Sequence, residues 1–529
     1  MSYQSFAFVA FSALVVFVYY LSGKRGQKWV LAAANLAFYA LSGIQYLPFL
    51  AVTMIATFFA SRKIGLIYEK LDADLLGVED MAEKKALRNK AKADAKKVLG
   101  VGLAIAIALL AVCKYTLFMV RNINGIMSIF GGPQIEMFKM ILPVGISFYT
   151  FMAISYVLDI YWKRYKCEKN FLNYAVYLSY FPHVVQGPID RYNEFNAQIE
   201  NGVPFSYENL TFGAQLTLWG FFKKLVVADG IGKIISPVFG NWQNSNGMSI
   251  AVALVLFSIQ IYGDFSGCID IITGVSEMLG IKLRKNFNHP YFSKTMPEFW
   301  RRWHISLQEW FKDYIYYPVS ASAFTKKVKK SLKGKEKKRL EELFTSCFPI
   351  LVVWLVTGIW HGASWNFVVW GLFHAAVLIG SQVFEPAFTL VNEKLHIKTE
   401  SFLWGLWQMT RTYVICCIGR IFFKAPTLSA GVGWIGRMLS PWSIGAFLND
   451  FGITGGENIL SVVLIPAWFV AALWLVDMLQ EKTGGLRAVV AKKPLVIRWM
   501  LIYALIFSII VFGCYGPGYS ASDFIYEQF

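Results

Sequence analysis

Apolar runs with few charges recur along this 529-residue chain and are long enough to cross a lipid bilayer. A membrane-spanning helix needs about 20 mostly apolar residues, because the hydrocarbon core is about 30 Å thick. Hydrophobic residues make up 56% of the chain and charged residues only 16%, whereas soluble proteins average about 25% charge. A soluble domain of this size would need more polar surface. Clear runs are Ser5–Leu21, Val98–Val120, Cys347–Trp360, Ser401–Phe423, Ile459–Val476 and Met500–Cys514.

These runs predict an all-α, polytopic integral membrane protein with about eleven to thirteen transmembrane or re-entrant helices. No stretch has the composition of a separate soluble domain, so residues 1–529 are expected to form a single membrane domain. Within it, the second half of segment 61–97 is expected to form a surface helix. Segment 326–339 carries nine Lys and Arg against one acid, so we expect it to be mobile.

The net charge of +18 follows the loops between apolar runs, which favours a membrane protein over a nucleic-acid-binding one. Lys and Arg concentrate in cytoplasmic loops of membrane proteins. If the N-terminus lies outside, successive spans bring three successive basic loops to the inside. We therefore expect a multi-pass protein of the plasma or inner membrane, with anionic lipid headgroups beside its lysines. The basic clusters are Lys24, Arg25 and Lys28, then 61–97, 163–169 and 326–339.

The seven cysteines mostly lie in or beside the apolar runs, and three acidic residues also lie within such runs. The cysteines form no CxxC pair, which favours buried reduced thiols over a disulfide framework or a metal site. The acids Asp159, Asp264 and Asp270 lie at membrane depth, where charges are costly and often functional. Asp264 stands between small residues, which would let substrate approach closely. A proton- or ion-coupled transporter would use such acids, so transport is one hypothesis.

Two of the six histidines lie in tryptophan-rich blocks, EFWRRWHISLQEWFKDYIYYP (298–318) and WHGASW (360–365). A neutral imidazole can accept a hydroxyl proton near pH 7, so His304 and His361 are candidate general bases. Helical spacing predicts that 298–318 forms one helix with an aromatic stripe that includes His304. Such a helix could equally be an interfacial element in which His304 is a bystander.

His361 ends an uncharged run and Gly362 follows it, so the chain can open there and expose backbone dipoles to a developing oxyanion. The alternative is a histidine packed against a carbonyl at a helix end. His374 lies in the next apolar run and is expected to be structural. No catalytic role is expected for three further histidines, which are His183, His289 and His396.

Several blocks together resemble the membrane-bound O-acyltransferase family. They are PVGISFYTFMAISYVLDIYW (143–162), WGFFKKLVVADGI (219–231), IYGDFSGCIDIITGVSEMLG (261–280), PEFWRRWHISLQEWFKDYIYYP (297–318), GIWHGASWNFVVWGLFHA (358–375) and the C-terminal FIYEQF. The resemblance covers nearly the whole chain and is strongest to the bacterial branch that serves alginate O-acetylation. The C-terminal block departs from this resemblance at one position, because it has Glu527 where the resemblance leads us to expect Phe.

The resemblance implies a membrane O-acyltransferase that moves acetyl groups from a cytoplasmic thioester, such as acetyl-CoA, toward a cell-surface or exported polysaccharide. The family's catalytic histidine falls on His361, and a second conserved position falls on His304. The resemblance also implies a secreted or membrane-anchored acyltransferase partner. D-alanyl transfer to teichoic acid is the alternative reaction. Other expected substrate-binding residues are Arg301, Arg302, Trp300, Trp303, Trp360, Trp365 and Asp264; no metal is expected.

The charge pattern makes a topology prediction. Segments 61–97 and 326–339 should both face the cytoplasm, because both are rich in Lys and Arg. Single cysteines placed in each segment of a Cys-free variant can be probed with a membrane-impermeant maleimide. We expect labelling only after the cells are permeabilised, and labelling of either segment in intact cells would reverse the assignment.

Overall fold

The structure is a computed structural model that describes every residue except 333, 335–336, 454–457 and 517–529. Within that part of the chain all regular elements are helices, and a single isolated bridge joins Phe287 to Trp303. The prediction of an all-α, polytopic membrane protein is confirmed. The C-terminal FIYEQF block lies outside the described residues.

The chain folds into two compact units. The first comprises Met1–Thr217 with Ile272–Arg284, and the second comprises Leu218–Ile271 with Lys285–Phe529. Two helices cross the boundary, α8 (Tyr207–Phe221) and α10 (Gly247–Met278). A single membrane domain over residues 1–529 stays a prediction.

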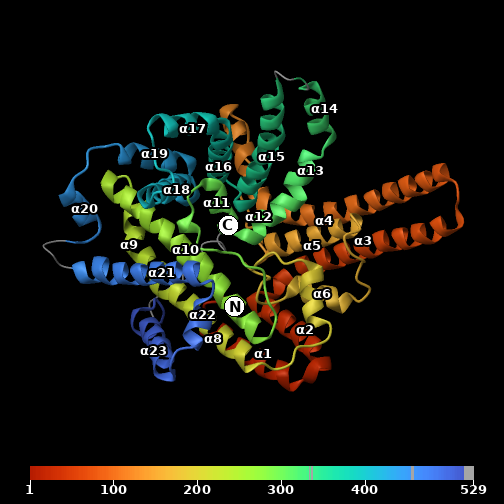
Figure 1. The fold of residues 1–529 in the computed structure, drawn as a ribbon, viewed down its shortest axis with the longest axis horizontal. Coiled ribbons are helices and arrows are strands. Elements are labelled where there is room, and N and C mark those ends of the chain that lie inside the picture. Colours follow the sequence, from red (N-terminus) through yellow and green to blue (C-terminus); the bar gives the residue numbers. More distant parts are fainter. Residues whose placement is uncertain (333, 335–336, 454–457, 517–529) are drawn as a thin grey trace. The chain divides into compact units, whose positions relative to one another are not determined.

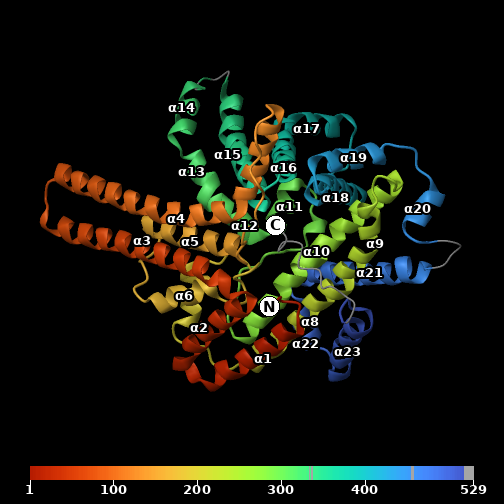
Figure 2. The same ribbon diagram turned by 180° about the vertical axis from the view of Figure 1, so that it is seen from behind.

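In the first unit the helices α3 and α4 run side by side as a long antiparallel pair, visible from both sides (Figure 1, Figure 2). The surface helix expected within segment 61–97 is the beginning of α4 and continues without a break into the apolar run at 98–120. The elements of this unit are α1 (Phe6–Leu21), α2 (Gly23–Ser42), η1 (Ile44–Tyr46), α3 (Leu47–Asp74), η2 (Leu75–Gly77), α4 (Met81–Ile129), α5 (Ile146–Tyr161), α6 (Phe171–Ser179) and α7 (Tyr192–Ile199).

The second unit holds both histidine blocks. The basic segment 326–339 is partly helical, in α14 and from Lys338 onward, and the rest of it includes residues outside the description. The elements of this unit are η3 (Phe222–Ala228), α9 (Asp229–Gly240), η4 (Pro290–Phe292), α11 (Met296–Arg302), α12 (Ile305–Phe311), η5 (Lys312–Tyr316), α13 (Tyr317–Ser320), α14 (Ala323–Ser331), α15 (Lys338–His361), α16 (Trp365–Val383), α17 (Glu385–Lys394), α18 (Phe402–Lys424), α19 (Leu428–Met438), α20 (Ile444–Asp450), η7 (Leu460–Leu464), α21 (Ile465–Thr483), α22 (Leu486–Ala491) and α23 (Leu495–Phe512).

Among the described residues, seven helices are long and apolar enough to cross a membrane, and α1 and α5 are shorter apolar helices. These are fewer than the eleven to thirteen expected segments. Other long helices carry charges that lower their hydropathy, such as Arg420 in α18. The seven are 44–77, 81–129, 247–278, 338–361, 365–383, 460–483 and 495–512.

Gly358 of α15 and Gly371 of α16 let these two helices pack backbone against backbone. A side chain at Gly371 of α16 would overlap the carbonyl oxygen of Trp354 and stand 3.1 Å from the Cα of Gly358 on α15. A side chain at Gly362 would overlap the ring of Phe367. The close approach of these helices sets the position of His361 at the end of α15.

Candidate active site

The FWRRWH block is not part of one continuous helix, and the prediction for 298–318 is wrong on this point. Helix α11 ends at Arg302, Trp303 is extended, and His304 adopts a left-handed backbone with φ 48° before α12 begins. The backbone instead hydrogen-bonds to residues 286–288: Asn288 N donates to Arg302 O and Ile305 N donates to Asn286 O, each at 2.9 Å. His304 and Trp300 therefore do not share one helical stripe. Few side chains adopt such backbone angles, and strained positions cluster at functional sites.

Asn286 sets the proton position on His304. The Asn286 Oδ1 atom accepts from the Ser306 amide at 3.2 Å and the Ser306 hydroxyl at 2.9 Å, so it is the acceptor for His304 Nδ1 at 3.0 Å. The imidazole proton therefore lies on Nδ1, and Nε2 is the basic nitrogen. Burial lowers the pKa of His304 to about 3, so the ring is neutral at physiological pH.

His361 is buried at the end of α15 among aromatic rings. Its centroid lies 4.7 Å from that of Trp360, 4.8 Å from Trp370 and 5.7 Å from Phe423. Gly362 continues in an extended conformation, so the helix does end at this histidine as the sequence predicted. Because His361 is at the carboxyl end of α15, the helix presents its backbone carbonyls, the negative end of the helix dipole, beside this imidazole.

The two candidate histidines belong to one aromatic cluster. The Trp360 ring contacts both of them, at 6.4 Å from His304 and 4.7 Å from His361, centroid to centroid. The cluster continues through Trp370 to His374, which lies 4.8 Å from Trp300. Both imidazoles thus contact the same tryptophan in a buried aromatic cluster of the second unit, where electrostatic effects are strong.

Of the predicted substrate-binding residues, three lie in or beside this cluster: Trp300, Trp303 and Trp360. Two others are largely open to solvent: Arg301 is exposed and Trp365 is 55% exposed. Arg302 forms ion pairs with Glu298 at 3.0 Å and Glu481 at 2.8 Å.

Asp264 lies in a separate buried ion network. The Lys224 ammonium is 2.7 Å from Asp264 and 2.9 Å from Asp229, and Lys223 is 2.6 Å from Asp270. Small neighbours of Asp264 therefore allow lysines from the π-helical segment η3 to approach. The carboxylate of Asp264 is thus engaged in an ion pair with Lys224. Its expected role in binding substrate stays a prediction.

The histidines that were expected to have no catalytic role have other surroundings. In the first unit both ring nitrogens of His183 are occupied, by Asp190 Oδ2 at 3.0 Å and the Tyr177 carbonyl at 2.9 Å. His289 Nδ1 lies 3.5 Å from Asp477, and His396 is exposed in a loop. These environments suit structural residues.

Sequence reasoning missed Asn286 and Arg420. Asn286 carried no signal, because its partner lies 18 positions away across a loop. Arg420 did carry a signal, because it is a charged residue within the apolar run Ser401–Phe423. Charged residues at membrane depth are costly and are therefore candidates for a functional role. Arg420 is 6% exposed and lies over the rings of Trp303 and Tyr291.

The environment of His304 makes a prediction about its titration. Because burial depresses its pKa from about 6.5 to about 3, the stabilising effect of the neutral buried ring is complete above pH 6.5 and is lost as the pH falls toward 3. Nitrogen NMR of histidine-labelled protein, assigned with a His304→Gln variant, should show the Nδ1–H tautomer unchanged down to about pH 5. A protonation midpoint near about 6.5 would mean that this ring faces water.

Comparison with known proteins identifies the family. The model of the membrane-bound O-acyltransferase family matches residues 168–419, which contain both candidate histidines. A probable alginate O-acetylase of Azotobacter vinelandii is 30% identical over 482 residues, covering 90% of this chain and 86% of the relative. A peptidoglycan O-acetyltransferase of Helicobacter pylori is 28% identical over 81% of this chain and 77% of its own length.

A teichoic acid D-alanyltransferase of Streptococcus thermophilus is also 28% identical, but over only 45% of this chain and 56% of its own length. The matches to the two O-acetylating relatives thus cover far more of the chain. This multi-pass membrane protein is an O-acyltransferase and belongs to the membrane-bound O-acyltransferase family.

Proposed function

We propose that this protein takes an acetyl group from a cytoplasmic thioester and passes it to an acceptor hydroxyl, for O-acetylation of a cell-surface or exported polysaccharide. One observation carries the proposal: His304 and His361 lie in one buried tryptophan cluster, and both contact the ring of Trp360. The long matches to alginate and peptidoglycan O-acetylating relatives support acetyl as the group and a polysaccharide as the final acceptor.

The proposed step is a direct acyl transfer. The imidazole of His361 takes the proton of the acceptor hydroxyl, whose oxygen forms a bond to the acyl carbonyl carbon. The carbon–sulfur bond of the thioester breaks, and the proton passes from His361 to the departing thiolate. The products are an ester and a free thiol, so atoms and charges balance. His304, held by Asn286 and in contact with the same Trp360 ring, positions the reactants.

Two alternatives remain to be tested. D-alanyl transfer to teichoic acid is the other acyl reaction, and the match to the Streptococcus thermophilus D-alanyltransferase covers less than half of this chain. Transport without acyl chemistry would use membrane-embedded acids, but all three candidates are paired with cations. Asp159 binds Arg164 at 2.9 Å, Asp264 binds Lys224 and Asp270 binds Lys223. Acids held in ion pairs are poorly suited to take up and release a transported ion.

The histidine assignment can be tested with acetyl-CoA as donor and release of free thiol as the readout. His361→Ala should lower turnover about 10²–10⁴-fold, because it removes a general base. His304→Ala should also impair turnover, and His374→Ala should be milder than either. The control is His396→Ala, at an exposed loop position. All variants should elute as monodisperse protein, and a His361→Ala variant with full activity would refute the mechanism.

We also propose that a secreted or membrane-anchored acyltransferase partner forms the final ester on the polymer, while this chain brings the acetyl group across the membrane with its N-terminus outside. The cluster around His361 is enclosed by aromatic rings, which suits a small acyl group better than a polymer. Acetylation of surface polysaccharide should require co-expression of both proteins and an intact His361. Full-rate acetylation of polymer by the purified chain alone would show that no partner is needed.

A further inference from the structure

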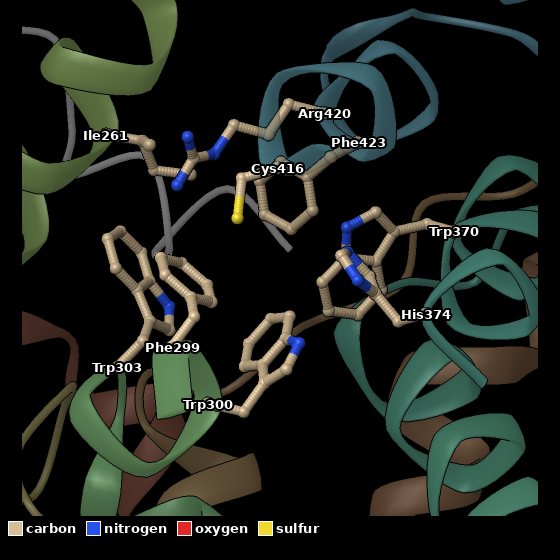
Figure 3. Close-up of a pocket in the computed structure, with 9 residues that line it drawn as sticks. All are labelled: Ile261, Phe299, Trp300, Trp303, Trp370, His374, Cys416, Arg420 and Phe423. Carbon is tan, nitrogen blue, oxygen red and sulfur yellow. The ribbon is translucent and has the colours of Figure 1, made fainter. Parts of the chain in front are cut away.

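A small cavity lies within the second unit, in the part of the aromatic cluster that contains His374 (Figure 3). The space open to the centre of a water-sized molecule is about 20 Å³, which is room for roughly one or two waters or a group of similar size. Helices α11, α16 and α18 supply most of its walls. The polar and indole side chains that line it are Trp300, Trp303, Trp370, His374, Cys416 and Arg420.

Arg420 brings a positive charge to this cavity without an acidic partner. Its guanidinium forms no ion pair among the described residues and lies instead 5.3 Å from the ring centre of Trp303 and 5.6 Å from that of Tyr291. Its Nη1 atom is buried and lacks a hydrogen-bond partner in the described part of the chain. A buried cation is costly unless acceptors surround it, and the two aromatic faces compensate only in part.

Two more buried polar atoms at the cavity lack partners among the residues described, Trp300 Nε1 and His374 Nδ1. Arginine and tryptophan side chains can only donate hydrogen bonds. No acidic side chain lines the cavity to accept them. Three polar atoms without partners in one small, otherwise apolar space indicate a ligand that supplies an oxygen acceptor on a small apolar group.

We propose that the cavity binds the acyl group of the donor, with its carbonyl oxygen toward the Arg420 guanidinium and its methyl group against the aromatic walls. This inference rests on the proposed function and identifies the group that the site selects. The carbonyl oxygen gains negative charge as the acceptor attacks, and a preorganised buried cation stabilises that charge. Arg420 is thereby a catalytic residue, and the cavity walls set the length of the acyl chain.

The position of the cavity fits this role. Trp370 and Phe423 line it, and both rings also contact His361. His374 closes one side, and its Nε2 atom would stand 2.9 Å from a Cβ added at Gly419 of α18. The cavity thus has little free space around His374. A longer acyl chain would collide with the walls of the cavity.

The first experiment compares acetyl-, propionyl- and butyryl-CoA as donors for the purified full-length protein. In the wild type each added methylene should lower kcat/KM about tenfold or more. His374→Ala and the milder Cys416→Ala enlarge the cavity and should reduce the preference for acetyl over butyryl, about tenfold or more in His374→Ala. Cys417→Ala is the control for Cys416→Ala, because Cys417 forms a hydrogen bond with Ser258 and does not line the cavity. Unchanged chain-length preference in either active variant would overturn the inference.

The second experiment tests the cation. Arg420→Gln should lower kcat about 10²–10³-fold with a smaller effect on KM, as expected for a group that stabilises transition-state charge. Arg411→Gln on the same helix is the matched control, because Arg411 is bonded to the Lys294 carbonyl and should leave kcat unchanged. An Arg420→Gln variant that is folded and has wild-type kcat would contradict the role.

The outcomes separate this inference from the proposed function. If the wild type is active and depends on His361 but the cavity variants change nothing, only the inference fails. If the wild type uses no thioester, the proposed function fails, and the cavity is tested with acetate, which has the same methyl and oxygen groups. Thermal stability should rise in sodium acetate relative to sodium chloride at equal ionic strength, and Arg420→Gln should abolish the rise. No rise in the wild type would then overturn the cavity assignment as well.

Discussion

The second unit depends on buried ion pairs that join the segment η3 to its neighbouring helices. The Lys224 ammonium lies between Asp229 and Asp264 and ties the π-helical segment η3 to α9 and α10. Removing one partner of such a pair typically costs about 3–5 kcal/mol, because it leaves an uncompensated buried charge. Phe265, next to Asp264 on α10, has its ring 4.8 Å from that of His304. The ion network thus anchors the helix that forms one wall of the candidate active site.

The two candidate histidines are held by different means. His304 is oriented by hydrogen bonds, because Asn286 fixes its tautomer and the 286–288 segment replaces the helical bonds lost at the break. The ring of His361 packs against those of Trp360 and Trp370, at the end of a helix whose glycines allow close contact with α16.

Arg420 connects the candidate site to the specificity of the reaction. The same guanidinium stacks on Trp303, next in sequence to His304, and lines the cavity whose wall includes Trp370, a neighbour of His361. One buried cation can therefore influence both histidine environments through shared aromatic rings. In the proposed complex, tryptophans of both sequence blocks therefore enclose the polar groups that face the acyl group.

The sequence by itself determined the membrane class, the all-helical fold, the family and the tryptophan blocks that carry the histidines, because apolar runs and local motifs are written in consecutive residues. It also predicted the helix end at His361, since an apolar run followed by glycine is a local signal. It failed at 298–318, where helical spacing predicted one stripe and long-range hydrogen bonds to Asn286 and Asn288 broke the helix. Only the tertiary structure decided that Asp264 meets Lys224, that Arg420 reaches Trp303, and that His304 and His361 share Trp360, because each of these contacts joins segments far apart in the chain.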